Sequence, residues 1–463
     1  MVISIVKVKV LALLLGPSGV GLMGLYQNIM GMTATLAGCG IESSGVRQVA
    51  STADEAETLA TVRRSIWLAS LVLGVSGMVI LWLLRESMSR WVFGDTVHTQ
   101  EVGWLGFGLL LTLLAGSQIA LLQGLRRIGD LARISIISAM VAAVVGILAV
   151  YYLDESGVLW FVLTAPAVNF IVASYYAARV PSIESAFDLL AIKKQWQALL
   201  KLGIPLMSAA LVTLVTQLAV RSIVLRELGL DASGYFQAAW VISVTYVGFI
   251  LNAMAMDYYP RLTAAINDRI QARKLVNEQA EVALLLAGPV FLAMITFAPW
   301  VISLLYTQGF GLAADLLRWQ VLGDILKLAG APIVFIFLAT GRGGIAIGIQ
   351  CIWSAAYLGA LSIGVKEVGL VLAGVGFWVA YLTYFVVVTL VARKTFGFKL
   401  AHRNWVVMLL LLLTGGLVIY LASQSLVLSY TAGLLATVTA GIYSLRRLDH
   451  LIDLAGWLRL RFL

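Results

Sequence analysis

Long apolar stretches, separated by short polar segments, fill the chain from end to end. A bilayer core takes about 20 residues of helix, and stretches of that length recur with charges mainly between them. The predicted spans are 19–41, 65–84, 102–125, 131–153, 158–178, 199–225, 232–256, 280–306, 316–340, 344–365, 369–392, 405–422 and 426–445. With a shortened helix over residues 1–15, this pattern predicts an all-α polytopic membrane protein of about fourteen transmembrane helices.

The first fifteen residues reach only about 22 Å as a helix, which is less than a full crossing. A cleaved signal peptide is the alternative, but Lys7 and Lys9 interrupt its apolar run. The following Gly16-Pro17-Ser18-Gly19 also lacks the small-x-small cleavage pattern. We therefore interpret this segment as a shortened first helix, and a start codon assigned too far downstream would explain its missing turns.

A loop signature occurs twice, 213 residues apart, as Leu15-Gly16-Pro17-Ser18-Gly19-Val20-Gly21 and Leu228-Gly229-Leu230-Asp231-Ala232-Ser233-Gly234. Glycine permits a tight backbone reversal and Pro17 fixes one dihedral angle, so a turn explains the signature. Arg47 and Arg261 follow corresponding helices at nearly the same spacing. The repeat predicts two parallel six-helix lobes, a division typical of alternating-access transporters. The predicted domains are an N-terminal lobe (1–178), a cytoplasmic linker (179–198), a C-terminal lobe (199–392), and two extra helices with a tail (393–463).

Composition agrees with this class, because 61% of residues are hydrophobic, 12% are charged and the mean hydropathy is +0.96. The net charge of +9 comes from cations spread over short loops, so it does not indicate nucleic-acid binding. Most of these cations follow even-numbered helices or lie in the tail, which predicts that both termini are cytoplasmic. Cys39 and Cys351 have no metal-like spacing and are predicted to be small buried residues. We expect no metal and no cofactor.

Four cations fall inside apolar stretches, where a charge is costly and normally faces a partner or an aqueous cavity. They are Lys7, Lys9, Arg221 and Lys327. A cavity with this charge would attract an anion, and a cleft that opens sideways would admit a lipid. Lys7 and Lys9 have the alternative of snorkelling to the headgroups. Asp324 shares a helix face with Lys327, so the pair either neutralises itself or serves gating or ion coupling.

Other functional classes find less support in the sequence. A membrane polymerase or ligase would need a catalytic extracytoplasmic loop, and the longest candidate, 85–101, has only His98, which is predicted to be a solvated loop residue. A cation-coupled exporter of small amphipathic molecules is disfavoured for cationic cargo by the intramembrane cations. A purely structural subunit would leave those cations without a purpose. Polar groups such as Asn28, Asn169, Gln217 and Asn252 show no pattern that identifies a sugar.

Several short motifs together resemble one known family. They are Leu14-Leu15-Gly16-Pro17-Ser18-Gly19, Gln27-Asn28, Gly38 and Gly40, Asp257-Tyr258-Tyr259-Pro260-Arg261-Leu262, Leu305-Tyr306, and Gly323-Asp324 with Lys327. In order and spacing they resemble the O-antigen translocase and lipid III flippase family, of the superfamily that also contains multidrug and toxin extruders and lipid II flippases. The short first helix departs from the family pattern.

The resemblance implies a flippase that moves an undecaprenyl-diphosphate-linked oligosaccharide from the cytoplasmic to the periplasmic leaflet of a bacterial inner membrane. It implies membrane lipids as surroundings, and a polysaccharide polymerase and a chain-length regulator as partners. The predicted residues for the anionic headgroup are Arg221, Lys327, Lys7, Lys9, Arg47 and Arg261. Asp324 and Asp257 are the candidates for gating or for coupling to H⁺ or Na⁺.

Overall fold

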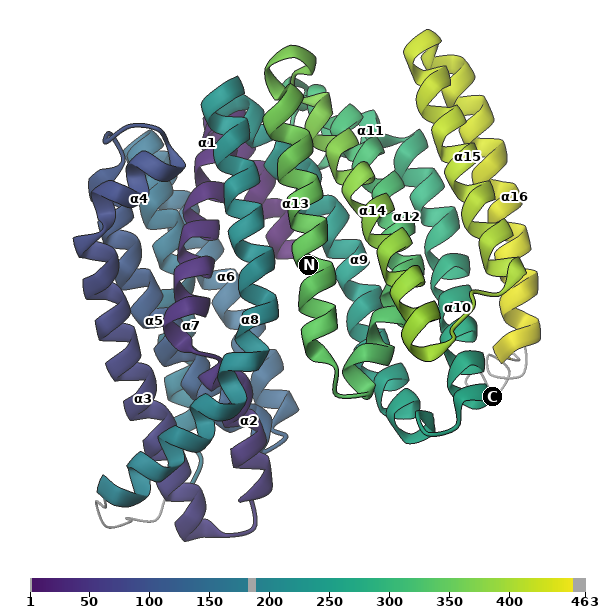
Figure 1. The fold of residues 1–463 in the computed structure, drawn as a ribbon. Helices are drawn as coiled ribbons and strands as arrows, with labels where there is room; N and C mark the ends of the chain where they lie inside the picture. The colour runs from purple at the N-terminus through teal and green to yellow at the C-terminus, as the bar shows by residue number, and fades with distance from the viewer. Residues whose placement is uncertain (1, 182–188, 453–463) are drawn as a thin grey trace, which may run out of the picture. The chain divides into compact units, whose positions relative to one another are not determined.

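The computed structural model describes residues 2–181 and 189–452, and within these ranges the chain is helical with no strand (Figure 1). It divides into two compact units, Met1–Gly234 and Tyr235–Leu463. The first contains α1 (Val2–Gly38), α2 (Ile41–Ser51), α3 (Ala56–Leu83), α4 (Arg85–Val92), α5 (Thr99–Gly124), α6 (Ile128–Leu153), η1 (Asp154–Ser156), α7 (Gly157–Ala178) and α8 (Leu189–Leu228). The second contains most of α9 (Leu230–Ala265), then α10 (Arg269–Thr296), α11 (Ala298–Leu305), η2 (Gln308–Phe310), α12 (Leu312–Ala339), α13 (Gly343–Val368), α14 (Val371–Phe396), α15 (His402–Gln424) and α16 (Leu426–Ile452).

The prediction of an all-α polytopic membrane protein is confirmed. In the described part of the chain, 11 stretches are long and apolar enough to cross a membrane. One of them, Ile128–Ala178, holds both α6 and α7, which pack against each other on either side of η1. The exact number of fourteen crossings stays a prediction, as do the lobe boundaries at 178 and 199. The predicted tail cations Arg459 and Arg461 lie outside the described residues.

Helix α1 is two helical segments joined by a reversal at the first loop signature. Gly16 has φ 65° and ψ −160°, which is not helical, and Pro17 follows it. Lys7 and Met30 nevertheless line the same cavity. A straight helix would separate them by about 34 Å, so the chain must fold back between them. The shortened first helix and the turn after it are therefore present as the sequence predicts.

The two copies of the loop signature pack directly against each other within the first unit. The second residue of each copy has a positive φ, 65° at Gly16 and 89° at Gly229. A Cβ on Gly21 would lie 2.7 Å from the carbonyl oxygen of Leu230, and a Cβ on Gly234 would overlap the backbone of Pro17. Glycine is thus required both for the turns and for the close approach of the two loops.

Helix α8 is longer than the predicted span, and it packs against α1, α2, α3 and α4 in the first unit. The last residues of the predicted linker (179–198) belong to the first turns of α8. The Trp196 indole donates a hydrogen bond to the carbonyl oxygen of Ser65 on α3, at 3.0 Å. This contact fixes the beginning of α8 against α3.

In the second unit, α12 packs against α10 and α14 and is its most enclosed long helix. The predicted span 280–306 is wrong as one helix, because α10 ends at Thr296 and α11 starts at Ala298. Pro299 explains the break, since proline lacks the N–H that would continue the preceding helix. The two extra helices α15 and α16 pack on α10.

Two minor predictions need correction. Cys351 is exposed and Cys39 is half-buried, so neither is a buried core residue. His98 is also not simply solvated: its Nδ1 lies 3.1 Å from the Tyr26 hydroxyl and its ring packs on Phe93 at 4.4 Å. The loop folds back over α1, so the histidine has a structural partner.

Candidate functional site

The first unit contains a cavity of about 450 Å³ with a lysine in its wall. We call it the Lys7 cavity; its lining is Lys7, Met30, Thr112, Ser135, Ser138, Ala139, Ala142, Ala165, Pro166 and Asn169. These residues come from α1, α5, α6 and α7. The reversal of α1 at Gly16 is what brings Lys7 beside Met30, so a local turn positions the charge of the cavity.

Lys7 is half-buried, and its Nζ lies 4.2 Å from the centroid of the Phe161 ring. A cation–π contact of this kind holds the ammonium while leaving its hydrogen-bond donors available. Ser138 donates to the Oδ1 of Asn169 at 3.5 Å, so two of the polar wall residues are oriented together. A cation surrounded by hydroxyl and amide groups can bind a phosphate or another compact anion.

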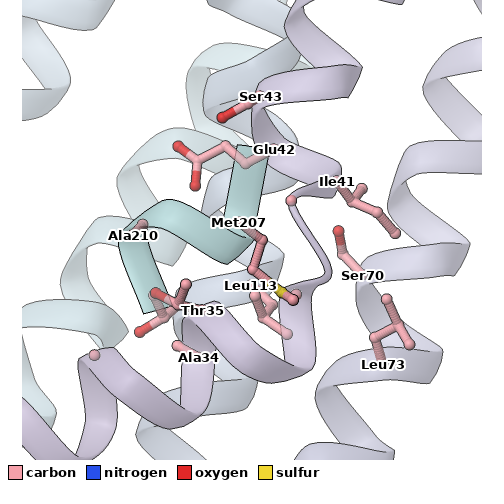
Figure 2. Close-up of a pocket in the computed structure, with 14 residues that line it drawn as sticks. Ala34, Thr35, Ile41, Glu42, Ser43, Ser70, Leu73, Leu113, Met207 and Ala210 are labelled. Atoms are coloured by element: carbon pink, nitrogen blue, oxygen red, sulfur yellow. The ribbon is translucent and has the colours of Figure 1, made fainter. Parts of the chain in front are cut away.

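A second cavity of about 360 Å³ lies next to the Lys7 cavity in the same unit (Figure 2). We call it the Glu42 cavity; its lining is Gly31, Ala34, Thr35, Gly38, Gly40, Ile41, Glu42, Ser43, Ser70, Leu73, Thr112, Leu113, Met207 and Ala210. Thr112 borders both cavities. Sequence reasoning missed Glu42, although it is the first charged residue after the predicted span 19–41 and so was visible as a carboxylate at a helix end.

Arg221 is only 5% exposed and donates from Nη1 to the carbonyl oxygen of Gly24 at 2.7 Å. One turn earlier along α8, Gln217 accepts a hydrogen bond from Asn28 of α1 at 3.5 Å. These contacts connect α8 to the second segment of α1. Arg221 lines neither the Lys7 cavity nor the Glu42 cavity, so its observed contact is structural and its headgroup role stays a prediction.

In the second unit, Asp324 and Lys327 lie on α12, where their charges interact and each has a further partner. Asp324 is fully buried, and its Oδ2 accepts a hydrogen bond from the Ser243 hydroxyl of α9 at 2.5 Å. Lys327 is half-buried, with its Nζ 5.4 Å from the centroid of the Tyr381 ring on α14. The sequence missed Ser243 and Tyr381, because neither residue type stands out in an apolar helix.

The remaining predicted residues lie apart from these clusters. Arg261 donates to Asp257 at 3.1 Å, and both side chains are largely exposed, so the two predictions form one surface ion pair. Arg47 is exposed on α2, and Lys9 is half-buried without lining the Lys7 cavity. Successive helical residues differ by about 100°, so Lys7 and Lys9 point in nearly opposite directions. Nothing in the structure assigns a ligand to these four residues.

The sequence also missed a buried carboxylate that connects the two extra helices to the second unit. Glu281 of α10 is 4% exposed and accepts from Arg403 of α15 and from Arg447 of α16, each at 2.8 Å. A nearby amide strengthens the same junction, since the Oδ1 of Asn277 accepts from the backbone N–H of Ala401 at 2.6 Å. The sequence signal that could have revealed this carboxylate is the presence of Glu281 inside the predicted apolar span 280–306.

Comparison with known proteins decides the family. A family model described as "Polysaccharide biosynthesis protein" matches residues 10–314, which is well over half of the chain. The chain belongs to this family. Lipid III flippases of Escherichia coli (strain K12) and Shigella flexneri are each 25% identical to it over 346 residues, which is 72% of this chain and 80% of each relative. The family that the sequence motifs indicated is thereby confirmed.

Solved structures support the fold of this polysaccharide biosynthesis protein. An inward-facing multidrug resistance MATE family transporter of the MOP superfamily has a TM-score of 0.72 at 17% identity, covering 85% of this chain and 94% of that structure. The lipid II flippase MurJ, inward closed, has a TM-score of 0.66 at 10% identity, covering 93% of this chain and 97% of that structure. The relatives are named as flippases and the neighbours as flippase or transporter, so the prediction of a transporter rather than an enzyme is confirmed at the level of the family.

Proposed function

We propose that this polysaccharide biosynthesis protein is a flippase for an undecaprenyl-diphosphate-linked oligosaccharide in a bacterial inner membrane. The proposed cargo is an O-antigen repeat unit or one like the enterobacterial common antigen, moved outward by alternating access of two lobes. The observation that carries the proposal is the Lys7 cavity, where one half-buried cation lies among hydroxyl and amide groups. The lipid III flippase relatives support the class of cargo.

The chemistry of this cavity matches a diphosphate headgroup. The Lys7 ammonium supplies the charge, while Ser135, Ser138 and Asn169 supply neutral hydrogen-bonding groups. Such groups favour an anion over a cation, which argues against an exporter of cationic drugs. The protein makes and breaks no bond in this function; its residues bind and orient the headgroup while the polyprenyl tail stays in the lipid.

The driving force in this proposal is partly electrical. An inside-negative potential contributes about 2.3 kcal/mol per elementary charge per 100 mV, and it favours outward movement of an anionic headgroup. Asp324, buried beside Ser243, is the proposed residue for coupling to H⁺ or Na⁺. A polysaccharide polymerase and a chain-length regulator are the proposed partners, with both termini of the flippase in the cytoplasm.

The test is a flipping assay in proteoliposomes with a fluorescent undecaprenyl-diphosphate-linked sugar, read by quenching of outer-leaflet dye. We expect protein-dependent transfer that slows when the membrane potential is collapsed with valinomycin and matched potassium. The same lipid without its diphosphate should not be moved. Equal transfer of the two lipids would refute the headgroup-binding role, and an unchanged rate without the potential would refute the electrical contribution.

A further inference from the structure

The Glu42 cavity contains polar groups to which the proposed function assigns no role. Within the described residues it is lined by one carboxylate, by the hydroxyl-bearing residues Thr35, Ser43, Ser70 and Thr112, and otherwise by glycine and apolar groups. Its volume of about 360 Å³ lies in the range of small-ligand sites. It is far more space than a proton or a bare cation needs, so the cavity fits a polar organic group.

Local backbone geometry directs the Glu42 carboxylate into this space. Gly40 ends the α1–α2 junction with φ 70°, and Glu42 lies in the first turn of α2. Its Oε2 approaches α5 where Gly116 has no side chain, since a Cβ there would be 3.0 Å from that oxygen. In Figure 2 the carboxylate lies on the same side of the junction as Thr35 and Ala210. The glutamate is therefore held against one wall and is accessible from the cavity.

The free hydrogen-bonding capacity of the cavity suits sugar hydroxyls. Among the described contacts, Glu42, Thr35, Ser43 and Ser70 make no side-chain hydrogen bond to protein, and the Thr112 hydroxyl donates to Gly108 while keeping its acceptor sites. An ionised carboxylate accepts hydrogen bonds at two oxygens, and hydroxyls both donate and accept. Adjacent sugar hydroxyls are the groups that satisfy such a set.

The cavity is also the immediate neighbour of the proposed diphosphate site. Thr112 lines both cavities, and the consecutive residues Met30 and Gly31 line one each. The two cavities thus share a wall, and a ligand that occupies both would place the group next to its diphosphate in the Glu42 cavity. In a lipid-linked oligosaccharide, that group is the sugar attached to the diphosphate.

We propose that the Glu42 cavity is a sugar subsite, which accepts a neutral, hydroxyl-rich sugar next to the diphosphate and disfavours a sugar that carries a carboxylate. The proposal rests on the proposed function, because the diphosphate at Lys7 sets the position of the sugar. Glu42 is the specificity-determining residue, because its charge attracts hydroxyl donors and repels the carboxylate of an acidic sugar.

Protonation of Glu42 should relax this selectivity. Burial raises the pKa of the Glu42 carboxyl above its ordinary value. The other charged residues on the helices that pack around the cavity do not line it; they include Arg47, Arg63, Arg64, Lys201, Lys7, Lys9 and Glu101. As pH falls, the carboxyl becomes neutral earlier than a solvated glutamate does, and the repulsion of an acidic sugar weakens while the hydroxyl-accepting strength is lost.

The experiment measures binding of three probes to the purified full-length protein in nanodiscs. The probes are undecaprenyl diphosphate alone, the same lipid with one neutral N-acetylhexosamine, and the same lipid with one hexuronic acid; undecaprenol serves as the blank. For Glu42→Gln we expect about tenfold weaker binding of the neutral-sugar probe, tighter binding of the acidic probe and unchanged binding of the bare diphosphate. In the unaltered protein, binding of the acidic probe should improve as pH is lowered, and in Glu42→Gln it should not.

Two further variants separate the subsite from general damage. Gly116→Ala narrows the cavity beside the Glu42 Oε2 but keeps the charge of Glu42. It should therefore weaken binding of the neutral-sugar probe, while the acidic probe still binds less tightly than the neutral one. Glu57→Gln, an exposed carboxylate at the start of α3, should leave all three probes unchanged. Equal affinity of the three probes, or no change in Glu42→Gln, would overturn the sugar subsite and leave the proposed function intact. Binding no tighter than that of undecaprenol would overturn both.

Discussion

The two units of the molecule place charged groups in opposite surroundings. In the first unit, Lys7 and Glu42 line neighbouring cavities, and each faces open space with hydroxyl groups around it. In the second unit, Asp324 and Gln320 are fully buried, and the carboxylate is packed against Ser243 with no exposed surface. Both arrangements put charge into an apolar helical bundle, but Lys7 and Glu42 line cavities whereas the Asp324 carboxylate is enclosed by side chains.

This difference suggests a division of labour. A cavity lined by hydroxyls binds groups that enter from water, whereas a carboxylate without access can exchange only a very small species when the helices around it move. In the proposed function, the first unit binds the cargo headgroup and the second responds to an ion. The substitutions below test whether binding of the cargo and the response to an ion can be lost separately.

Asp324→Asn should have the largest effect, because an amide can neither release nor take up a proton. We expect transfer in proteoliposomes to lose its acceleration by a proton or sodium gradient entirely, while binding of the bare diphosphate probe stays the same. Asp257→Asn is the matched control, since Asp257 is exposed and paired with Arg261 on the surface. Gradient acceleration that survives Asp324→Asn would remove the ion-responsive role of the second unit.

Lys7→Gln should weaken binding of undecaprenyl diphosphate by about thirtyfold, since a hydrogen bond to a charged group is worth about 2 kcal/mol. Lys9→Gln, two residues away and outside the cavity lining, should change it by less than about threefold. Isothermal titration in nanodiscs measures both. Equal effects of the two substitutions would mean that the positive charge acts through the general field and not through the Lys7 cavity.

Glu281→Gln should destabilise the second unit by about 1–2 kcal/mol, because it leaves Arg403 and Arg447 close together without their shared carboxylate. The estimate is discounted because both arginines are partly exposed. Thermal unfolding in detergent and proteolysis within 397–401 report the loosening of α15 and α16. Glu278→Gln, one turn away and exposed, is the control and should shift the unfolding temperature little.

Arg221→Ala should cost about 1 kcal/mol of stability, since it removes the hydrogen bond from Arg221 to the Gly24 carbonyl. Arg226→Ala, at the exposed end of the same helix, serves as the comparison. Thermal unfolding and diphosphate binding are measured together. If Arg221→Ala leaves stability unchanged and abolishes binding of the diphosphate, Arg221 belongs to the cargo site. The assignment of Arg221 to a structural role would then be wrong.

Local signals in the sequence predicted much of the helical framework. The turn at Gly16-Pro17 and its copy at Gly229 were predicted correctly, because backbone conformation at glycine and proline depends on neighbouring residues alone. The break before α11 was missed even though Pro299 marks it, since hydropathy averages over a window and ignores a single proline. Trp196 was assigned to the linker, because nothing local shows that α8 begins before it.

The site was predictable only in part. Lys7 was among the candidates, but so were Lys9 and Arg221, which the structure places outside the cavities. Glu42 was not a candidate, because a carboxylate at the end of a span is ordinary until a cavity is found beside it. Ser243 was invisible for the same reason: a serine in an apolar helix gains meaning only from the Asp324 carboxylate it meets.

By itself, the sequence determined that this is a helical membrane protein with a duplicated loop. It also determined that the chain belongs to a family of polysaccharide biosynthesis proteins. Those properties depend on residue type, spacing and order along one chain. Only the tertiary structure decided which charges face open space, which are bonded to backbone, and that the cavity with Lys7 lies beside a hydroxyl-lined one. The reason is physical: hydropathy and turn chemistry act over a few residues, whereas a cavity exists only where four or five distant helices fail to fill the space between them.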